Sequence, residues 1–240
     1  YRNVMKQLLT VMLLTLMTMG AQAQKVVKLW DNTTAPHSSG LTGPEKDEGQ
    51  VRYSNTTEAV LYIFEAKKKV ATGQAVVVVP GGGYRKVCIE YDGFGVAQYL
   101  RSIGITAVVV KYRLPNGHRE IPFEDTLEAM RFLRKEGAKW GVDPNQVGIL
   151  GSSAGGYLAA HISTVTADAE KPAFAILVYP VISGTTRSTH HGTFGNMLGL
   201  SRTDAEQEYY SLENRVSPTT PPTLLLLADD DLTVPTISST

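Results

Sequence analysis

Short runs of apolar residues recur along the chain, and stretches with helical character lie between them. Continuous apolar runs rich in β-branched residues are typical of strands that are buried on both faces of a sheet. Such runs stand at residues 26–30, 60–65, 75–79, 106–111, 146–150, 174–179 and 223–228. Amphipathic or helix-favouring stretches stand at residues 96–102, 120 to about 140, and 156–161. The pattern predicts strands that alternate with helices.

This alternation predicts an α/β fold with a mostly parallel central sheet and helices on both faces. One segment, residues 185–222, breaks the alternation, because it is polar and carries two His residues and a single predicted helix at 203–210. We expect it to be an insertion that covers the active site. The length of 240 residues suits one domain with a sizeable core.

The first 23 residues have the layout of a secretory signal peptide. A basic region begins at Met5, residues 8–17 are apolar, and residues 21–23 form an A-x-A cleavage site. The apolar run is too short for a comfortable membrane span. We therefore expect residues 1–23 to be a signal peptide with a few upstream residues. Residues 24–240 are then expected to form a periplasmic or secreted domain without membrane association.

Charge and cysteine content exclude several kinds of partner. The 23 Lys and Arg residues balance 23 Asp and Glu residues, so the net charge is zero, and nothing predicts binding to nucleic acid or to an anionic membrane. The single cysteine, Cys88, cannot form an internal disulfide and is expected to be a small buried hydrophobic residue. No metal ion and no organic cofactor is predicted.

Gly151-Ser152-Ser153-Ala154-Gly155 is the motif with the most chemical content. A predicted buried strand precedes it and a helix-favouring stretch follows it. A Ser on such a sharp turn has a strained backbone and an exposed hydroxyl, and small residues two positions to each side allow the turn. The pattern alone also fits a Gly/Ser-rich loop. The flanking strand and helix favour a nucleophile elbow with Ser153 as the nucleophile.

Pro80-Gly81-Gly82-Gly83-Tyr84 directly follows the strand predicted at 75–79. Acyl transfer through a Ser needs donors that hold the oxyanion, and glycines here allow backbone N–H groups to turn toward a carbonyl oxygen. Gly82 and Gly83 are the candidates, together with Ala154 after the nucleophile. The alternatives are a flexible turn or a phosphate-binding loop. The dinucleotide fingerprint is incomplete, because its last Gly is missing.

Asp229-Asp230-Asp231 follows the strand predicted at 223–228, with Val234-Pro235 shortly after it. With these motifs in this order, the sequence resembles the α/β-hydrolase superfamily, in which a D-x-x-V-P turn at this place carries the triad Asp. The resemblance implies that Asp231 is the triad acid, with Asp230 as the alternative. Without the resemblance, three consecutive acids would suggest a solvated loop or a weak cation site.

The resemblance extends over nearly all of the expected mature chain and narrows to one group of enzymes. The sequence is similar to exported bacterial esterases grouped with acetyl xylan esterases. The motifs that carry this similarity are Pro80-Gly81-Gly82-Gly83-Tyr84, Asp92-Gly93, Lys111-Tyr112-Arg113-Leu114-Pro115, Gly151-Ser152-Ser153-Ala154-Gly155-Gly156 and Thr220-Pro221-Pro222-Thr223. Fold and elbow are shared by esterases, lipases and peptidases, so the motifs specify the superfamily better than the substrate.

The triad His that the resemblance implies is not found after Asp231, where nine residues follow without any His. We expect the last strand, the His loop and the closing helix to be missing from a C-terminally truncated chain, with severely impaired activity. His161, on the helix after Ser153, is expected to point away from the hydroxyl. His37 and His118 are expected in polar, solvated segments. His190 and His191 belong to the inserted segment, which could bring one of them near Ser153.

The resulting functional hypothesis is a secreted serine carboxylesterase that removes small acyl groups, chiefly acetyl, from plant polysaccharide such as xylan. The expected partner is an acylated carbohydrate or another small ester, and the sequence gives no oligomeric state. Two alternatives remain open. One is an exported peptidase or general short-chain esterase with the same machinery, and the other is a catalytically inactive carbohydrate-binding homologue.

Overall fold

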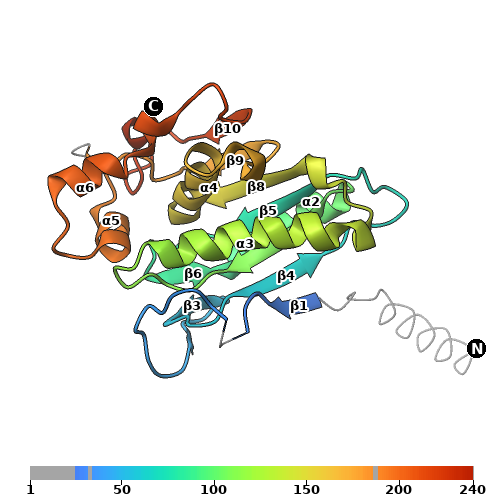
Figure 1. Ribbon diagram of the computed structural model, residues 1–240, viewed down its shortest axis with the longest axis horizontal. Coiled ribbons are helices and arrows are strands. Elements are labelled where there is room, and N and C mark those ends of the chain that lie inside the picture. The colour runs from blue at the N-terminus through green and yellow to red at the C-terminus, as the bar shows by residue number, and fades with distance from the viewer. Residues whose placement is uncertain (1–24, 32–33, 186–188, 240) are drawn as a thin grey trace, which may run out of the picture.

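A seven-stranded, mostly parallel sheet forms the centre of the molecule (Figure 1). The computed structural model describes residues 25–31, 34–185 and 189–239, so the predicted signal peptide lies outside the described residues. Across the sheet the strands are β1 (Lys25–Lys28), β4 (Val60–Phe64), β7 (Thr106–Lys111), β5 (Ala75–Val79), β8 (Val147–Ser152), β9 (Ala175–Val178) and β10 (Thr223–Leu226). These are the strands that the apolar runs predict, most of them shorter by one or two residues.

The strand directions follow from the connections. β1 and β4 pair antiparallel with their neighbours, whereas β7, β5, β8, β9 and β10 run parallel. Helical crossovers join the parallel strands, which places helices on both faces of the sheet. All residues of β5, β7 and β8 are buried, which explains why these strands are continuous apolar runs in the sequence.

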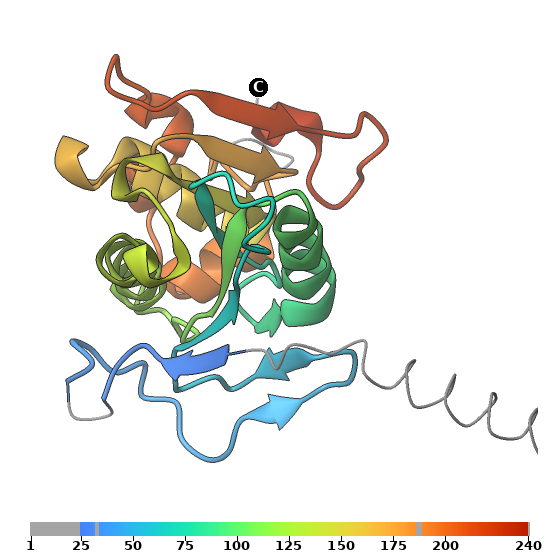
Figure 2. The same cartoon turned by 90° about the vertical axis from the view of Figure 1, so that its right-hand side faces the viewer.

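Helices cover both faces of the sheet, as Figure 2 shows. The helix α2 (Gly95–Ser102) lies on one face, and α3 (Glu120–Glu136) and α4 (Ala154–Thr164) pack together on the other. The predicted helix from residue 120 to about 140 divides into α3 and the 3₁₀ turn η2 (Gly137–Trp140), which Gly141 ends in a left-handed conformation with φ 72°. Further short turns are η3 (Pro144–Gln146) and η4 (Asp168–Glu170).

The structure also contains a small second sheet that the sequence did not predict. It consists of β2 (Lys46–Asp47), β3 (Arg52–Ser54) and β6 (Lys86–Cys88) in antiparallel pairing. Strands of two or three residues are too short to show a period in the sequence. Cys88 ends β6 and is only half-buried, which corrects the expectation of a fully buried side chain. Burial still raises the pKa of its thiol.

The segment 185–222 runs between β9 and β10 and holds α5 (His191–Leu198), α6 (Asp204–Tyr209) and η5 (Leu212–Arg215). The predicted helix at 203–210 corresponds to α6, where Thr203 and Glu206 form a capping box. The sequence did not predict α5. Its two glycines weaken the helical signal, and the burial of Phe194 and Met197 in the core stabilises it instead.

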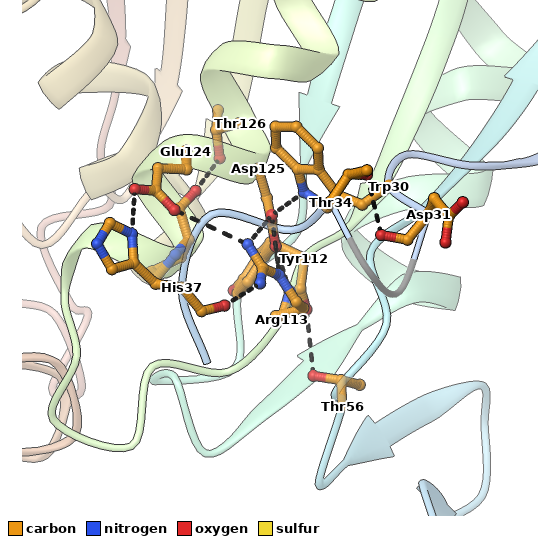
Figure 3. A network of polar contacts seen from close by, with 11 residues as sticks. Trp30, Asp31, Thr34, His37, Thr56, Tyr112, Arg113, Glu124, Asp125 and Thr126 are labelled. Carbon is orange, nitrogen blue, oxygen red and sulfur yellow. Dashed lines mark hydrogen bonds and ion pairs between the residues drawn. The ribbon is translucent and has the colours of Figure 1, made fainter. Parts of the chain in front are cut away.

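A buried ion pair ties the N-terminal segment to the core (Figure 3). Arg113, which follows β7, donates from Nη2 to Asp125 Oδ1 of α3 over 2.7 Å, and Trp30 Nε1 donates to the same oxygen over 2.6 Å. Arg113 Nη1 donates to the carbonyl of His37 over 2.6 Å. Every one of these charges has a partner, as buried charges require. This bond fixes the backbone of His37, and the His37 ring contacts Glu124 of α3.

The strand β10 is an edge of the sheet, as Figures 1 and 2 show. Three of its leucines are 43–52% exposed: Leu224, Leu225 and Leu226. An exposed apolar edge strand is a template for unwanted pairing with another chain. Among the described residues, no helix is long and apolar enough to cross a membrane. The remaining turns are η1 (Glu90–Phe94), which is π-helical, and η6 (Thr236–Ser238).

Candidate active site

Ser153 occupies a sharp turn between β8 and α4. Its backbone has φ 55° and ψ −120°, a region that non-glycine residues rarely adopt and that costs about 1–3 kcal/mol. The flanking glycines make room for this turn. A Cβ on Gly151 would stand 2.1 Å from the carbonyl oxygen of Gly155, and one on Gly155 would stand 2.1 Å from the carbonyl oxygen of Val79. The predicted elbow geometry is therefore present.

The Ser153 side chain lines an open cavity of about 450 Å³. Its other lining residues come from the glycine loop, the segment before and within α5, and the loop after β10: Gly82, Gly83, Arg85, His190, Gly192, Asn196 and Thr233. No hydrogen bond holds the Ser153 hydroxyl within the described residues. The cavity lies at the carboxyl ends of β5 and β8, where ligands of parallel sheets are bound.

The start of the glycine loop is fixed by three hydrogen bonds. Tyr112 Oη donates to the carbonyl of Pro80 over 2.9 Å. The N–H of Gly81 donates to Asp92 Oδ2 over 3.0 Å, and the carbonyl of Gly81 accepts from the N–H of Cys88 over 3.0 Å. Both polar groups of Gly81 are thus engaged within the protein.

The carbonyls further along the loop are engaged as well. The carbonyl of Gly82 accepts from the N–H groups of Arg85 and Lys86, each over 3.2 Å. The carbonyl of Gly83 accepts from Asn196 Nδ2 of α5 over 2.8 Å. Gly82 and Gly83 have φ values of 131° and 62°, which glycine adopts without strain. The tight turn and the contact with α5 therefore set the direction of their peptide groups.

The N–H groups of Gly82 and Gly83 are different, because no partner for them is found among the described residues. The N–H of Ala154, at the first position of α4, also lacks an intrahelical partner. Tyr84 is buried below the loop and donates from Oη to the carbonyl of Ala154 over 2.9 Å. It thus connects the glycine loop to the start of α4. The three predicted oxyanion donors belong to two segments that contact each other directly.

Asp231 differs from its two acidic neighbours in the loop after β10. Its Oδ1 accepts from the N–H groups of Thr233 and Val234 over 2.8 and 2.9 Å, and Val234 is buried. Asp229 and Asp230 are exposed. The Asp231 carboxylate is therefore oriented by the loop, with Thr233 at the cavity that holds Ser153. This geometry favours Asp231 over Asp230.

Of the five His residues, only His190 lines the cavity of Ser153. His161 stacks on Phe123 with ring centroids 3.8 Å apart, and burial lowers its pKa to about 4. His118 is half-exposed beside Glu120, and His191 is exposed. The expectation that His161 packs away from the hydroxyl agrees with this arrangement.

The ring of His190 is held by α5, whose N-terminus it caps. Its Nδ1 accepts from the N–H of Thr193 over 3.1 Å and lies 2.8 Å from the hydroxyl of the same residue. Since Nδ1 accepts, the neutral ring carries its proton on Nε2. With Nδ1 engaged by Thr193, His190 in this arrangement is not placed as a base for Ser153.

Several residues that position the site were not assigned a role from the sequence, although Tyr84 and Tyr112 stand in motifs that carry the resemblance. Tyr84 and Tyr112 are buried with pKa values raised well above the usual value by desolvation, so their hydroxyls remain donors. Asn196 lies 113 positions from the Gly83 carbonyl that it contacts. Partners so far apart leave no periodicity or spacing to detect. Within the described residues, no group of His, Cys, Asp or Glu is placed to hold a metal ion.

A strained Ser between a parallel strand and a helix, next to a glycine loop with two free N–H groups, defines the α/β-hydrolase class. The chain belongs to that family: the model described as "alpha/beta hydrolase fold" matches residues 76–237. The chain is 40% identical over 171 residues to an acetylxylan esterase of Xylanibacter ruminicola, covering 70% of this chain and 36% of that protein. It is 36% identical over 180 residues to endo-1,4-beta-xylanase B of Butyrivibrio fibrisolvens, covering 68% and 28%.

Solved structures give the same fold. An acetyl ester-xyloside bifunctional hydrolase from Caldicellulosiruptor lactoaceticus superposes with a TM-score of 0.73 at 30% identity, covering 90% of this chain and 78% of that one. Esterase 2 of Thermogutta terrifontis, at 21% identity and a TM-score of 0.63, shares the fold. The chain spans about a third of the length of these two curated relatives.

Proposed function

We propose that this protein is a serine carboxylesterase that removes acetyl groups from xylan or a related plant polysaccharide. The observation that carries the proposal is the glycine loop beside Ser153. The carbonyls of residues 80–83 and the N–H of Gly81 have partners within the protein, whereas the N–H groups of Gly82 and Gly83 have none among the described residues. An acetylxylan esterase and an acetyl ester-xyloside hydrolase among the relatives support the acetylated carbohydrate as substrate.

In this proposal Ser153 Oγ attacks the ester carbonyl carbon, and the carbonyl oxygen becomes an oxyanion. The N–H groups of Gly82, Gly83 and Ala154 stabilise that charge, and removing one such donor typically costs about 10²–10³ in kcat. The alcohol of the sugar leaves with a proton, and water releases acetate from the acyl-Ser153 ester. Asp231, already oriented by its loop, holds the base that moves these protons.

None of the His side chains described above is placed to act as that base. His190 is the one His at the cavity, and its Nδ1 is occupied by Thr193. We propose that full turnover requires a base held by Asp231, since loss of the base costs on the order of 10⁶ in kcat. We also propose that the protein is exported, which is supported by the signal-peptide layout of residues 1–23.

Acetate release from acetylated xylan by the full-length protein tests the proposal, with Ser153→Ala as the matched variant. A p-nitrophenyl acetate assay and an aminoacyl anilide assay run beside it. We expect Ser153-dependent release of acetate and no cleavage of the anilide. Faster cleavage of the anilide would establish the peptidase alternative. Binding of xylan without Ser153-dependent hydrolysis of any substrate would establish the carbohydrate-binding alternative.

A further inference from the structure

A partly buried carboxylate that the reaction does not use lies close to the nucleophile. Asp92 is on the π-helical turn η1 (Glu90–Phe94). The position of a Cβ on Gly81 would be 2.8 Å from Asp92 Oδ2 and 3.0 Å from Ser153 Cβ. The carboxylate and the nucleophile thus both lie next to the same glycine. π-Helical turns are rare and frequently occur at functional sites.

The two oxygens of Asp92 accept from two different segments. Oδ2 accepts from the N–H of Gly81 over 3.0 Å, and Oδ1 accepts from Tyr179 Oη over 3.1 Å. Desolvation raises the pKa of Asp92, although both hydrogen bonds act in the opposite direction. Desolvation and the adjacent carboxylate raise the pKa of Tyr179 to about 12, so the phenol stays protonated and donates.

Tyr179 extends this contact to the strands that carry the rest of the site. It follows β9 with φ 35°, a strained value for a residue with a side chain. Its N–H donates to the carbonyl of Leu226 at the end of β10 over 2.8 Å, shortly before the loop of Asp231. Asp92 therefore joins the start of the glycine loop to the end of the sheet that bears the acidic loop.

The position of Gly81 decides what the next two residues can do. If the N–H of Gly81 lost this acceptor, its peptide group would be free to rotate, and the peptide groups of Gly82 and Gly83 would rotate with it. Their N–H groups would then no longer point at the oxyanion. A preorganised oxyanion site depends on donors that are held before the reaction begins. The carboxylate accepts the hydrogen bond of the Gly81 N–H and so holds that peptide group in place, and because the contact is partly buried, water competes with it less than at the surface.

We propose that Asp92 is a positioning residue for the oxyanion site, acting as a hydrogen-bond acceptor that fixes Gly81 and thereby aims the N–H groups of Gly82 and Gly83. This role rests on the proposed esterase function. Asp92 itself touches neither substrate nor the reacting atoms.

Covalent labelling of the full-length protein by a fluorophosphonate tests the role. In this reaction Ser153 Oγ bonds to phosphorus, fluoride leaves, and the Ser proton passes to solvent. The phosphoryl oxygen occupies the oxyanion site, so the limiting rate of labelling (kinact) reports on the donors. The apparent affinity for the reagent (KI) reports on the cavity.

We expect Asp92→Leu, which keeps the shape but accepts no hydrogen bond, to lower kinact about tenfold or more with KI unchanged. Asp92→Asn is expected to stay within about threefold of the wild type, because its oxygen can accept from Gly81 while its amide donates to Tyr179. Asp143→Leu is the matched control. It removes a carboxylate that accepts from the N–H of Asn145 at the other end of β8, and it should leave kinact unchanged.

Wild-type kinact in folded Asp92→Leu would overturn the proposal, and so would an equal loss in Asp92→Asn and Asp92→Leu. If the Leu variant does not fold, Tyr179→Phe carries the test. It frees one side of the carboxylate and should lower kinact a few-fold at constant KI, and an unchanged kinact refutes the role. Absence of Ser153-dependent labelling in the wild type is a separate result, because it refutes the esterase function itself.

Discussion

Acidification should destabilise the protein through His161, before most carboxylates are protonated. The ring stacks on Phe123, and its Nδ1 is buried without a hydrogen-bond partner among the described residues. Burial, with a smaller contribution from Arg215, lowers the pKa of His161 from 6.5 to about 4. The unfolded chain therefore binds a proton at this side chain between pH 6.5 and 4, while the folded chain does not. Stability is full above pH 6.5 and is lost as the pH falls through this window.

The size of the effect follows from the displacement of the pKa. At about 1.4 kcal/mol per pH unit, a change from 6.5 to about 4 corresponds to at most about 3.5 kcal/mol. Because His161 is not fully buried, solvent reduces this effect and we expect about 2 kcal/mol. Urea unfolding of wild type and His161→Phe should therefore give a stability difference that shifts by this amount between pH 7 and pH 4. The Phe variant keeps a ring to stack on Phe123 and cannot take up a proton.

The comparison isolates His161, because other titrating groups are common to both proteins. His118→Phe is the matched control, because it makes the same substitution at a half-exposed ring. A stability difference between wild type and His161→Phe that stays constant from pH 7 to pH 4 would refute the reasoning. It would mean that the folded protein binds the proton as readily as the unfolded chain.

Three further substitutions probe the elbow, the buried ion pair and the sheet edge. Gly155→Ala places a Cβ 2.1 Å from the carbonyl oxygen of Val79 and should lower the free energy of unfolding by about 3 kcal/mol or more in urea titration. Asp125→Ala leaves Arg113 buried without its carboxylate and should cost about 3–5 kcal/mol in the same assay. Leu225→Lys puts a charge on the exposed edge strand and should reduce aggregation measured by light scattering.

Each of these has a matched control. Gly95→Ala introduces a Cβ whose nearest neighbour is 4.0 Å away, at a helical position where Ala is favourable, and should be neutral or stabilising. Glu58→Gln weakens the exposed pair with Lys28 and should change stability by less than about 1 kcal/mol. Leu200→Lys changes a leucine that is 93% exposed away from the sheet edge. Equal aggregation of the Leu200 and Leu225 variants would contradict the assignment of β10 as the hazardous edge.

The strands of the main sheet were predictable because their burial is visible in the sequence. In β5 every side chain is buried, so the whole strand is apolar, and no other pattern competes with that interpretation. The elements that escaped prediction are stabilised by distant contacts. α5 contains Gly192 and Gly195 and is a poor helix by propensity, but Phe194 is fully buried and packs on Tyr157 of α4. Tertiary packing overrides local preference there.

The residues of the site likewise fall into those that the sequence predicts and those that it does not. Ser153, Gly82 and Gly83 are recognisable because backbone strain imposes local sequence requirements at a turn. The residues that position these groups have no local sequence signature, because each acts through a contact with a segment distant in the sequence. Asp92 could have been noticed from its place in the resemblance, but its contact with Gly81 emerges only when η1 folds over the loop.

One close contact explains why nucleophile and oxyanion donors are held together. Gly155 lies so near the end of β5 that a Cβ there would be 2.1 Å from the carbonyl oxygen of Val79 and 2.5 Å from that of Pro80. The same glycine permits the strained turn at Ser153. The elbow and the start of the glycine loop are therefore both in contact with Gly155. A larger residue at position 155 would increase the distance between Ser153 and Gly82. Gly155→Ala should consequently lose fluorophosphonate labelling even where its folded fraction is restored by lower temperature, whereas a variant that is only unstable, such as Asp125→Ala, should regain it.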